Sequence, residues 1–459
     1  MIKDLLTEEP CGQHTVTRGW VRTKRTMKNL VFIEVYDGSC FAALQCTFDR
    51  TTELSIETQT TLDALSTGAS VEISGKLVSS PAQGQCVELA ADEARLIGAA
   101  SGESYPLQKK GHSFEFLREI AHLRPRTATI GAVARIRSRL AYAVHTFFQE
   151  QGFQYVHTPI ITTNDAEGTG AMFQITTLDL AKITAGTLDY SKDFFGKKAF
   201  LTVSGQLEGE TYAAALSRIY TFGPTFRAEN SNTSRHLAEF WMIEPEIAFA
   251  HLEDDMALAE KFIKYLFTDI LDKHSDDLEF FDTHIEKGLI ATLQSVADSR
   301  FTHITYTDAI RELEHHAANF EFKPFWGCDL QSEHEKFLTE QLAHGPVIVT
   351  DYPKEIKAFY MKTNSDGKTV RAMDVLVPRL GEIIGGSERE DDLEQLQLRM
   401  RELGMDIPSY WWYLDLRRFG SVPHAGFGLG FERLVQYVTG MANIRDVIPY
   451  PRAAGQAEF

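Results

Sequence analysis

The order of strand-like segments in the first hundred residues constrains the fold of this chain more than any other feature. Five segments there alternate polar with apolar side chains and are rich in β-branched residues, as half-buried strands are. They span residues 15–25, 30–37, 41–48, 70–79 and 85–97. A helix-like stretch at 52–65 follows the third segment, and Asp37-Gly38 suits a tight turn between the second and third. This order predicts an OB-fold barrel over residues 1–99.

The remainder of the chain mixes helices and strands without a regular βαβ rhythm. Residues 100–125 are predicted to be a linker, and apolar residues recur at three- and four-residue steps over 131–151, which predicts a long helix. We expect further helices at about 255–270, 283–297 and 431–438, strands at 153–161, 201–204, 219–227, 239–249, 347–350, 357–361 and 371–377, and either type at 411–419. The prediction is an α+β fold, with an antiparallel sheet flanked by helices over 126–459 and a helical insertion at about 250–345.

Composition and charge exclude several classes of protein. The 459 residues suffice for two or three domains, and no stretch approaches the roughly 20 apolar residues of a membrane helix. The net charge of -18 means that any RNA contact must be a local basic surface on an acidic body. An odd cysteine count without CxxC spacing argues against a disulfide scaffold or a structural zinc site. The cysteines are Cys11, Cys40, Cys46, Cys86 and Cys328. With the acidic N-terminus, these features predict a soluble cytoplasmic protein.

Two segments carry more functional groups than packing requires. Residues 226–240 place Arg227, Arg235 and His236 around a polar loop between two predicted strands. The planar fork of arginine matches phosphate or carboxylate oxygens, although a surface hairpin can also be this charged. In 426–433, three glycines alternate ahead of a helix that opens with a glutamate and an arginine. Such glycines either let a ligand approach the backbone or simply make a tight turn.

Together with the helix, strand and proline at 131–159, these segments resemble the three signature motifs of class II aminoacyl-tRNA synthetases. The resemblance covers nearly the whole chain, because residues 14–98 are similar to the OB-fold anticodon domain of one subgroup. Residues 227–231, 239–244 and 381–389 look like those of asparaginyl-tRNA synthetases, in the aspartate, asparagine and lysine subgroup. The resemblance implies an enzyme that activates asparagine with ATP, releases pyrophosphate and transfers asparagine to the 3′ end of its tRNA.

The resemblance also implies where the ATP phosphates bind. Arg227 would hold the α-phosphate and the amino-acid carboxylate, and Arg433 would hold the γ-phosphate, with Arg235 and His236 beside it. The substrate carboxylate is already a nucleophile at neutral pH, so the work of the enzyme is to position anionic groups and neutralise their charge. A Ser-His-Asp or Cys-His pattern is therefore not expected.

The adenine and metal sites follow from the same resemblance. Phe240 would stack on adenine while Arg433 covers the other face, and Glu229 would accept the adenine amino group. Arg227, Glu229 and Arg433 are the predicted catalytic residues. Asp374 and Glu382 would supply hard oxygen ligands for Mg²⁺. Their spacing is one residue longer than in aspartate-type relatives, and a solvated strand end is the alternative for Asp374.

Residue 209 bears on which amino acid is bound. Aspartyl-tRNA synthetases carry a lysine where this chain has Gly209, between Glu208 and Glu210, so an aspartate side chain would lose its ion partner here. Hydrogen bonds to charged groups contribute about 1.5–3 kcal/mol, enough to favour a neutral asparagine. The resemblance places five residues around the amino acid, with capping or bridging as the alternative role of the carboxylates. They are Glu167, Ser204, Gln206, Glu244 and Arg389.

The predicted barrel offers a surface for the tRNA anticodon. Alternation along the second strand turns Phe32 outward, and alternation along the third puts Ala42, Leu44, Cys46 and Phe48 on the apolar face and Gln45 on the polar face. An exposed aromatic ring contributes about 1–3 kcal/mol per stacked base. The resemblance places Phe32 and Gln45 at anticodon-reading positions. A basic run over 18–28 supplies phosphate contacts, with a solvated face as the alternative; Arg22 and Arg25 are the members assigned to the anticodon.

Three other functions stay open. Gly209 disfavours an aspartyl-tRNA synthetase, and the barrel disfavours an asparagine synthetase paralogue built on the catalytic domain alone. A non-catalytic RNA-binding protein with a decayed site would have lost some motif residues, yet all are present. The resemblance further implies a homodimer with 131–159 at its two-fold interface. The expected partners are the tRNA with the asparagine anticodon, asparagine and ATP.

Overall fold

The computed structural model of this protein describes residues 1–10, 12–81, 85–108, 111–168, 171–182, 188–231 and 233–459. The chain forms two compact units, Met1–Arg135 with Phe459 and Ile136–Glu458. The linker predicted over 100–125 falls within the first unit. No helix in the described ranges has the length and apolar character needed to cross a bilayer.

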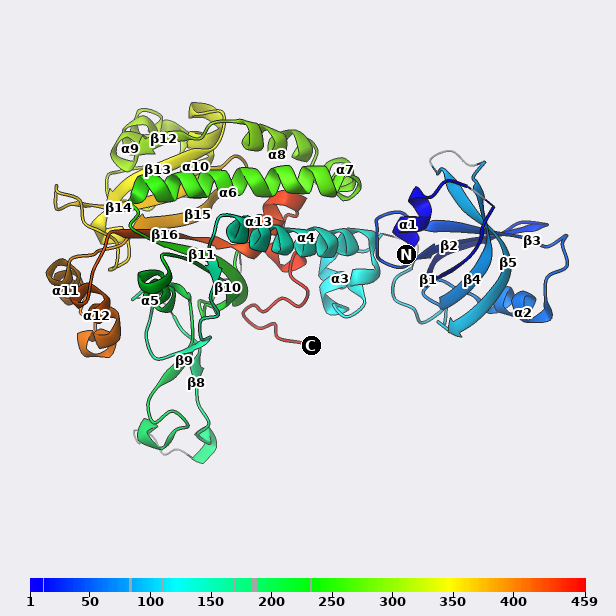
Figure 1. Ribbon diagram of the computed structural model, residues 1–459, viewed down its shortest axis with the longest axis horizontal. Helices are drawn as coiled ribbons and strands as arrows, with labels where there is room; N and C mark the ends of the chain where they lie inside the picture. The colour runs from blue at the N-terminus through cyan, green and yellow to red at the C-terminus, as the bar shows by residue number, and fades with distance from the viewer. Residues whose placement is uncertain (11, 82–84, 109–110, 169–170, 183–187, 232) are drawn as a thin grey trace. The chain divides into compact units, whose positions relative to one another are not determined.

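The first unit contains a closed five-stranded barrel, which confirms the predicted OB-fold (Figure 1). Its strands pair in the order β1-β2-β3-β5-β4 and are β1 (His14–Thr26), β2 (Leu30–Tyr36), β3 (Leu44–Asp49), β4 (Ser70–Ser79) and β5 (Val87–Gly98). As predicted, a helix, α2 (Ile56–Ala64), follows the third strand; α1 (Ile2–Thr7) and α3 (Phe114–Glu119) flank the barrel in sequence. Val31, Ile33 and Phe48 are among the fully buried apolar side chains inside.

One prediction for the third strand was wrong at its start. β3 begins at Leu44 rather than at 41, and Ala42 is exposed instead of lying on the apolar face. The turn after β2 is longer than two residues because the Asp37 carboxylate accepts hydrogen bonds from the backbone N–H groups of Ser39 and Ile2. From Leu44 onward Leu44, Cys46 and Phe48 are buried as predicted, but Gln45 between them is buried as well.

The second unit is built on an eight-stranded sheet of order β12-β13-β14-β15-β16-β11-β10-β6. The strands are β6 (Gln154–Tyr155), β10 (Arg218–Phe226), β11 (Glu239–Ala248), β12 (Thr302–Thr305), β13 (Val347–Pro353), β14 (Thr369–Val377), β15 (Gly381–Glu388) and β16 (His424–Gly430). The six central strands are antiparallel, and only the two edge pairs, β12–β13 and β10–β6, are parallel. The predicted antiparallel sheet is therefore confirmed.

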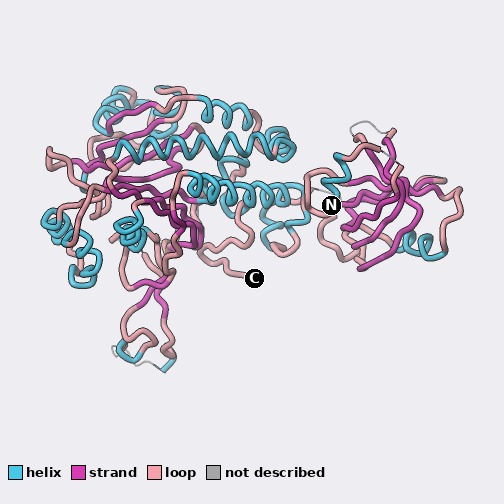
Figure 2. The backbone as a smooth tube through the Cα atoms, viewed as in Figure 1, coloured by secondary structure: helices cyan, strands magenta, loops and turns pink. Residues whose placement is uncertain are grey.

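Helices flank this sheet, as Figure 2 shows by colour. They are α4 (Ala128–Glu150), α5 (Gln206–Leu216), α6 (Leu252–Lys273), α7 (Ser275–His284), α8 (Leu289–Asp298), α9 (Tyr306–His315), α10 (Ser332–Lys336), α11 (Leu393–Glu402), α12 (Trp411–Arg418) and α13 (Phe431–Thr439). Short 3₁₀ turns lie at Arg124–Arg126, Leu180–Lys182, Tyr190–Lys192, Ala317–Asn319, Lys354–Ile356, Ile407–Tyr410 and Ile444–Asp446, and a π-helical turn at Phe337–Leu342. The long helix α6 packs across β14, β15 and β16.

The structure corrects several predicted elements. Residues 357–361 form turns rather than a strand, because Pro353 ends β13 and a 3₁₀ turn follows. The helix expected at 283–297 is two helices, α7 and α8, separated by Gly288 in the left-handed conformation (φ 84°). Residues 411–419 are helical. The region 250–345 is not purely helical, since it supplies the edge strand β12.

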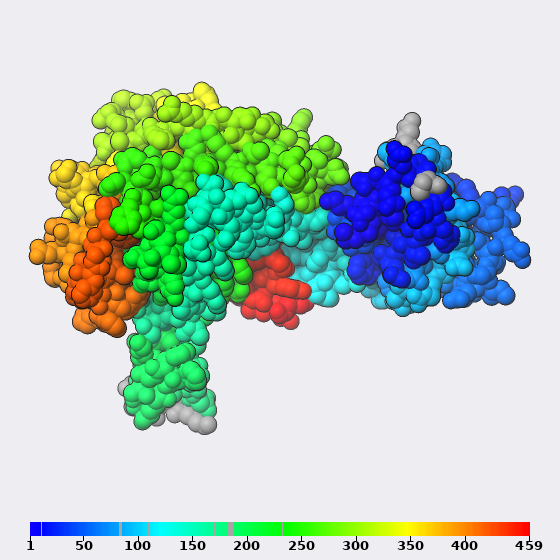
Figure 3. All heavy atoms as spheres, viewed as in Figure 1, coloured from blue at the N-terminus to red at the C-terminus, as the bar shows by residue number. Residues whose placement is uncertain are grey.

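One part of the second unit projects from its surface (Figure 3), and the ribbon places β8 and β9 of a small three-stranded sheet there (Figure 1). Its strands are β7 (Ile161–Thr162), β8 (Gln174–Ile175) and β9 (Ala199–Leu201). The strand expected at 153–161 is thus divided between two sheets, with only 154–155 in the large one. The chain leaves β9 directly into α5, so this projection ends where the candidate site begins.

Candidate active site

One strand positions most of the candidate site. Along β11, the side chains of Phe240, Met242, Glu244 and Glu246 alternate onto the same face of the sheet, because successive side chains of a strand point to opposite faces. Phe240 and Met242 line a first pocket, and Met242, Glu244 and Glu246 line a second. The two pockets therefore follow one another along β11, from Phe240 to Glu246.

The first pocket is open and has a volume of about 930 Å³. It brings together all seven residues predicted to bind ATP: Arg227, Glu229, Arg235, His236, Phe240, Glu382 and Arg433. They come from the loop between β10 and β11, from the start of β11, from β15 and from the first turn of α13. Two segments far apart in the chain thus place three arginines around one cavity, and β15 adds Glu382.

The two predicted catalytic arginines have weak or single partners in this pocket. Arg227 Nη2 donates to Glu167 Oε1 at 2.6 Å, and its guanidinium carbon lies 5.4 Å from the Phe240 ring centroid. Arg433 Nη1 donates to the Glu382 carbonyl at 3.1 Å and lies 3.5 Å from its carboxylate. Arg227 thus lies next to the ring predicted to stack on adenine, and the placing of Arg433 on the other face of the base stays a prediction.

Burial and nearby cations shift the pKa of His236, which also lines the first pocket. Burial, followed by the positive charge of Arg433, lowers the pKa of His236 below its usual value. A neutral imidazole can still donate one hydrogen bond to a phosphate oxygen. Arg235 Nη1 donates to the Ser332 hydroxyl at 2.9 Å, which anchors this loop to the start of α10.

A buried glutamate ties the signature segments together beneath the pocket. Glu432, on α13, accepts a hydrogen bond from the Trp241 backbone N–H at 2.8 Å and one from Arg137 Nη2 at 2.6 Å. Arg137 also lies over the Phe431 ring at 4.6 Å. Glu432 thereby joins α4, β11 and α13. Because Arg433 is the next residue of α13, these contacts fix the position of its backbone.

The second pocket has a volume of about 790 Å³ and contains all five residues predicted to bind the amino acid. These are Glu167, Ser204, Gln206, Glu244 and Arg389. It shares Arg227, Met242, Glu382 and Gly428 with the first pocket. A ligand in either pocket therefore meets Arg227 and Glu382, and the two sites adjoin at these side chains.

An ion pair lies in the wall of the second pocket. Arg389 donates through Nη2 to Glu246 at 2.5 Å, through Nε to the same carboxylate at 3.2 Å, and through Nη1 to the Ser387 hydroxyl at 2.7 Å. Both side chains are almost completely buried. Burial raises the pKa of Glu246 to about 7, against the lowering effect of Arg389. The pair presents a donor and an acceptor side by side with no net charge.

The carboxylate of Glu244 is hydrogen-bonded by groups of the protein itself. Its carboxylate accepts hydrogen bonds from the Ser204 hydroxyl, from the Gly205 N–H at 3.0 Å and from the Thr221 hydroxyl at 2.7 Å. The structure thus joins Glu244 and Ser204, two of the predicted residues, in one buried cluster that supports the start of α5. By contrast, burial raises the pKa of Glu167 although Arg227 stabilises its anion.

Sequence reasoning missed Glu246, Lys357 and Tyr360, which also line the second pocket. Glu246 carried a usable signal, because it follows Glu244 by two residues and so shares its strand face. Lys357 and Tyr360 lie in the turns that were predicted as a strand. Tyr360 packs under Arg389, with its ring centroid 5.1 Å from the guanidinium carbon. No local pattern announces this contact.

The glycines before α13 serve partly different purposes from those expected. A Cβ at Gly426 would lie 2.5 Å from the Glu246 carboxyl and 2.4 Å from the Pro245 carbonyl oxygen, so this glycine makes room for Glu246 rather than for a ligand. Gly428 and Gly430 line the first pocket, as the ligand-approach interpretation expects.

The two carboxylates predicted to bind Mg²⁺, Asp374 and Glu382, face the same space. A Cβ at Gly385 would lie 3.3 Å from Glu382 Oε1 and 3.5 Å from Asp374 Oδ1, so this glycine keeps open the space between them. Lys357 Nζ donates to both oxygens of Asp374, at 2.7 and 3.0 Å. Burial raises the pKa of Asp374, while Lys357 favours its anion. Across the described ranges, no group of three or more histidine, cysteine or acidic side chains is arranged to hold a metal by itself.

The predicted anticodon residues lie on the first unit. Phe32 sits on the outer face of β2, and the Arg25 guanidinium carbon is 5.6 Å from its ring centroid. Gln45 is buried and donates to Glu88 Oε2 at 2.9 Å. Arg22 turns toward the protein: it lies over Tyr36 at 4.9 Å, and burial lowers its pKa. Phe32 and Arg25 therefore lie against each other, whereas Gln45 is held by Glu88 and Arg22 by Tyr36.

The basic run at 18–28 is broken up by its partners in space. Arg18 pairs with Glu72 of β4, and Lys24 donates to the Leu65 carbonyl at 3.0 Å. The sequence shows no acid within the run, but the neighbouring strand supplies one.

The four described cysteines are free, and Cys11 lies outside the described residues.

Comparison with known proteins gives matches over the full length. The profile "tRNA synthetases class II (D, K and N)" matches residues 114–454, and "OB-fold nucleic acid binding domain" matches residues 15–97. The asparagine–tRNA ligase of Treponema denticola is 66% identical over 470 residues (100% of this chain, 99% of the relative), and that of Geobacter metallireducens is 59% identical over 460 residues (100% and 99%). Among solved structures, asparaginyl-tRNA synthetase from Pyrococcus horikoshii complexed with asparaginyl-adenylate superposes with a TM-score of 0.87 at 33% identity, covering 98% of each chain.

Proposed function

This chain belongs to the class II tRNA synthetases of the D, K and N group, and we propose that it is an asparagine–tRNA ligase. It joins asparagine to ATP as asparaginyl-adenylate, releases pyrophosphate, and transfers asparagine to the 3′ end of its tRNA. The observation that carries this proposal is the buried Arg389–Glu246 pair in the wall of the second pocket, next to a first pocket lined by arginines. The neutral pair suits a neutral amide.

Positioning drives the first step. Arg227 lines both pockets, so it can hold the substrate carboxylate and the α-phosphate together while the carboxylate attacks in line. Arg433, Arg235 and His236 stabilise the negative charge that develops on the departing pyrophosphate. Phe240 stacks on the adenine, and Glu229 accepts its amino group. Asp374 and Glu382 would hold Mg²⁺, which when bound supplies further positive charge to the phosphates.

The choice of amino acid follows from hydrogen-bond chemistry. A carboxamide has one acceptor oxygen and one donor NH₂, and these match the Arg389 donor and the Glu246 acceptor. An aspartate side chain has no donor for Glu246 and would bring like charge against it. A side chain at residue 209 would point toward Ile219, Thr221 and Glu246. Because this residue is glycine, it supplies no cation there to balance the carboxylate of a bound aspartate. Glu167 and Gln206 receive the α-ammonium.

The tRNA, dimer and location complete the proposal. Phe32, Arg25 and Gln45 on the barrel read the anticodon. Tyr142, Tyr155 and Trp241 are exposed apolar side chains in and beside the segment predicted at the two-fold interface, and a second copy of the chain would cover them. We place the homodimer in the cytoplasm, where reduced cysteines such as the four described here persist.

The test compares asparagine with aspartate in ATP–pyrophosphate exchange. We expect exchange that depends on asparagine, and aminoacylation of a transcript with the asparagine anticodon in preference to one with the aspartate anticodon. Faster exchange with aspartate would overturn the assignment. Gel filtration at the 51.7 kDa of one chain would contradict the dimer alone.

A further inference from the structure

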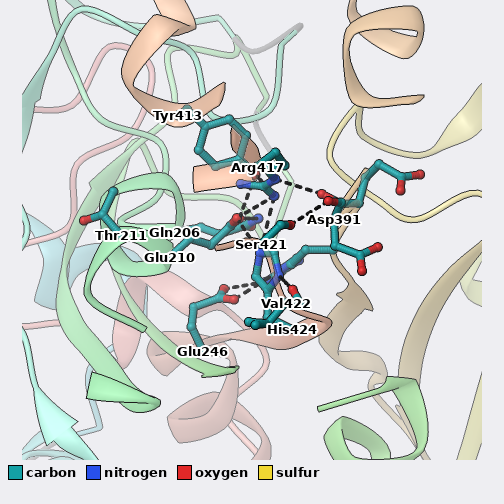
Figure 4. Close-up of polar contacts among 12 residues, drawn as sticks. Gln206, Glu210, Thr211, Glu246, Asp391, Tyr413, Arg417, Ser421, Val422 and His424 are labelled. Atoms are coloured by element: carbon teal, nitrogen blue, oxygen red, sulfur yellow. Dashed lines mark hydrogen bonds and ion pairs between the residues drawn. The ribbon is translucent and has the colours of Figure 1, made fainter. Parts of the chain in front are cut away.

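A buried carboxylate without an assigned role lies behind the second pocket. Glu210, on α5, makes four polar contacts within its own surroundings (Figure 4). Oε1 accepts from Gln206 Nε2 at 3.1 Å and from the Tyr413 hydroxyl at 2.9 Å. Oε2 accepts from Arg417 Nη2 at 2.9 Å and contacts His424 Nε2 at 2.9 Å. We call Glu210, Tyr413, Arg417 and His424 the Glu210 cluster.

The partners of Glu210 are themselves held in place. Arg417 is inaccessible to solvent, and its Nε donates to the Glu390 carbonyl at 2.8 Å. His424 Nδ1 faces the Val422 carbonyl at 2.9 Å, and because a carbonyl only accepts, this ring nitrogen carries a hydrogen. Burial disfavours the Glu210 anion, but the charge of Arg417 and the contact with His424 outweigh it and lower the pKa of Glu210. The buried guanidinium of Arg417 thus faces Glu210 as its counter-ion.

The Glu210 carboxylate, paired with Arg417, determines how one neighbour is oriented. A carboxylate accepts hydrogen bonds and cannot donate them, so only the NH₂ end of the Gln206 amide can face Glu210. Gln206 and Glu210 are four residues apart on α5 and therefore lie on the same helix face. Gln206 also lines the second pocket, so its carbonyl oxygen is the end left for a ligand.

We propose that Glu210, held by Tyr413, Arg417 and His424, is a positioning residue that keeps the Gln206 carbonyl oxygen directed at the α-ammonium of the bound amino acid. The proposal rests on the proposed function, because it takes the second pocket as the amino-acid site. An ammonium group is only a donor, and a reversed amide would turn N–H groups toward it. The Glu210 cluster excludes that reversed state before any ligand arrives.

The connection also explains why α12 and β16 meet α5 at this point. Tyr413 and Arg417 are four residues apart on α12, and His424 opens β16. None of the three lines the second pocket. Their hydrogen-bonded link to the pocket lining runs through Glu210 and Gln206, although the charge of Glu210 also acts on Arg389 and Glu246. A ligand that keeps the amide and lacks the ammonium group separates these two routes.

The test replaces both buried charges together, because removing Glu210 alone would leave Arg417 as an uncompensated buried cation. In Glu210→Gln/Arg417→Gln, residue 210 can donate as well as accept, so Gln206 can reverse. We expect the KM for asparagine in pyrophosphate exchange to rise about tenfold while the KM for ATP stays within about twofold. The same pair of changes is then made in a Gln206→Met protein. We expect its KM for asparagine to equal that of the Gln206→Met single variant, since the amide that Glu210 orients is gone.

A ligand without the α-amino group separates positioning from general damage. The compound 3-carbamoylpropanoate has the carboxylate and amide of asparagine but no ammonium. We expect the charge-pair variant to lose affinity for asparagine and to keep its affinity for this analogue, measured by competition. Equal losses for both ligands, or equal KM increases in the native and Gln206→Met backgrounds, would overturn the proposal.

A milder variant covers the case in which the double substitution does not fold. Tyr413→Phe removes one donor to Glu210 and keeps the ring, and we expect it to raise the KM for asparagine about two- to fivefold, again only when Gln206 is present. An unchanged KM would refute the positioning role. A native protein that exchanges no pyrophosphate with asparagine would instead refute the proposed function, so the two failures are distinguishable.

Discussion

The two adjoining pockets handle positive charge in opposite ways. In the first, Arg227 and Arg433 keep about a third of their side-chain surface exposed, at 36% and 31%. In and behind the wall of the second, Arg389 and Arg417 are exposed by 3% and 0%, and each is paired with a buried glutamate. Arginines of the first pocket remain available for anions, whereas those of the second are neutralised by the protein itself.

The difference follows from what each guest carries. A nucleotide brings several negative charges, so a site for it can hold its cations in partly exposed pairs, here with Glu167 and Glu382, that leave donors for the ligand. A carboxamide brings none, and an unpaired buried cation beside it would attract aspartate instead. Neutralising Arg389 with Glu246 removes that attraction while keeping a donor and an acceptor in place. The comparison teaches that specificity for the amide depends on charge balance as much as on shape.

The largest expected effect comes from removing a cation of the first pocket. Arg227→Ala takes away the group shared by both pockets, and we expect kcat/KM for pyrophosphate exchange to fall about 10²- to 10³-fold. Arg311→Ala, at an exposed pair with Asp308 on α9, is the matched control and should retain activity. A loss below tenfold for Arg227→Ala would mean that the available arginines do not carry the chemistry.

Breaking the charge balance of the second pocket should have the next largest effect. Glu246→Gln leaves Arg389 without its anion, and the asparagine-to-aspartate ratio of exchange rates is expected to fall about 10- to 100-fold. The measurement is the two kcat/KM values under identical conditions. If the ratio does not move, the neutral pair has no part in discrimination.

The barrel offers a region outside both pockets for a third comparison. Phe32→Ala removes a stacking surface worth about 1–3 kcal/mol, so we expect the KM for tRNA to rise about tenfold. Pyrophosphate exchange, which needs no tRNA, should be unaffected. Loss of exchange in this variant would show that the barrel face supports the fold of the catalytic unit rather than binding RNA.

The smallest expected effect is in the pH dependence of stability. Glu335 lines a cavity with Glu382 and Arg433, and burial, followed by repulsion from Glu382 and Asp374, raises its pKa from 4.5 to about 7. A raised carboxyl pKa favours folding when protonated, so this contribution is full below about pH 4.5 and is lost as the pH rises through about 7. Denaturant unfolding of Glu335→Gln should show a flatter stability profile than the native protein between these values. An identical profile would contradict the shift.

Much of the site was visible in the sequence because it lies on regular elements. The charged loop before β11 indicated Arg227, the helix after the glycines indicated Arg433, and the resemblance to class II synthetases added Phe240; the structure brings all three to one pocket. Glu246 stayed hidden because its role depends on Arg389, 143 residues away. Lys357 stayed hidden because a turn was taken for a strand. The region 250–345, which showed no chemistry, supplies Glu335 to the cavity beside Glu382.

The sequence by itself determined the barrel, the antiparallel sheet and the identity of the arginine-bearing motifs, since each depends on local periodicity or on contiguous residues. Only the tertiary structure decided which charges are neutralised. Arg389 meets Glu246, Arg417 meets Glu210 and Lys357 meets Asp374 only after distant segments pack together. Charge balance is a sum over neighbours in space, and spacing along the chain does not contain it.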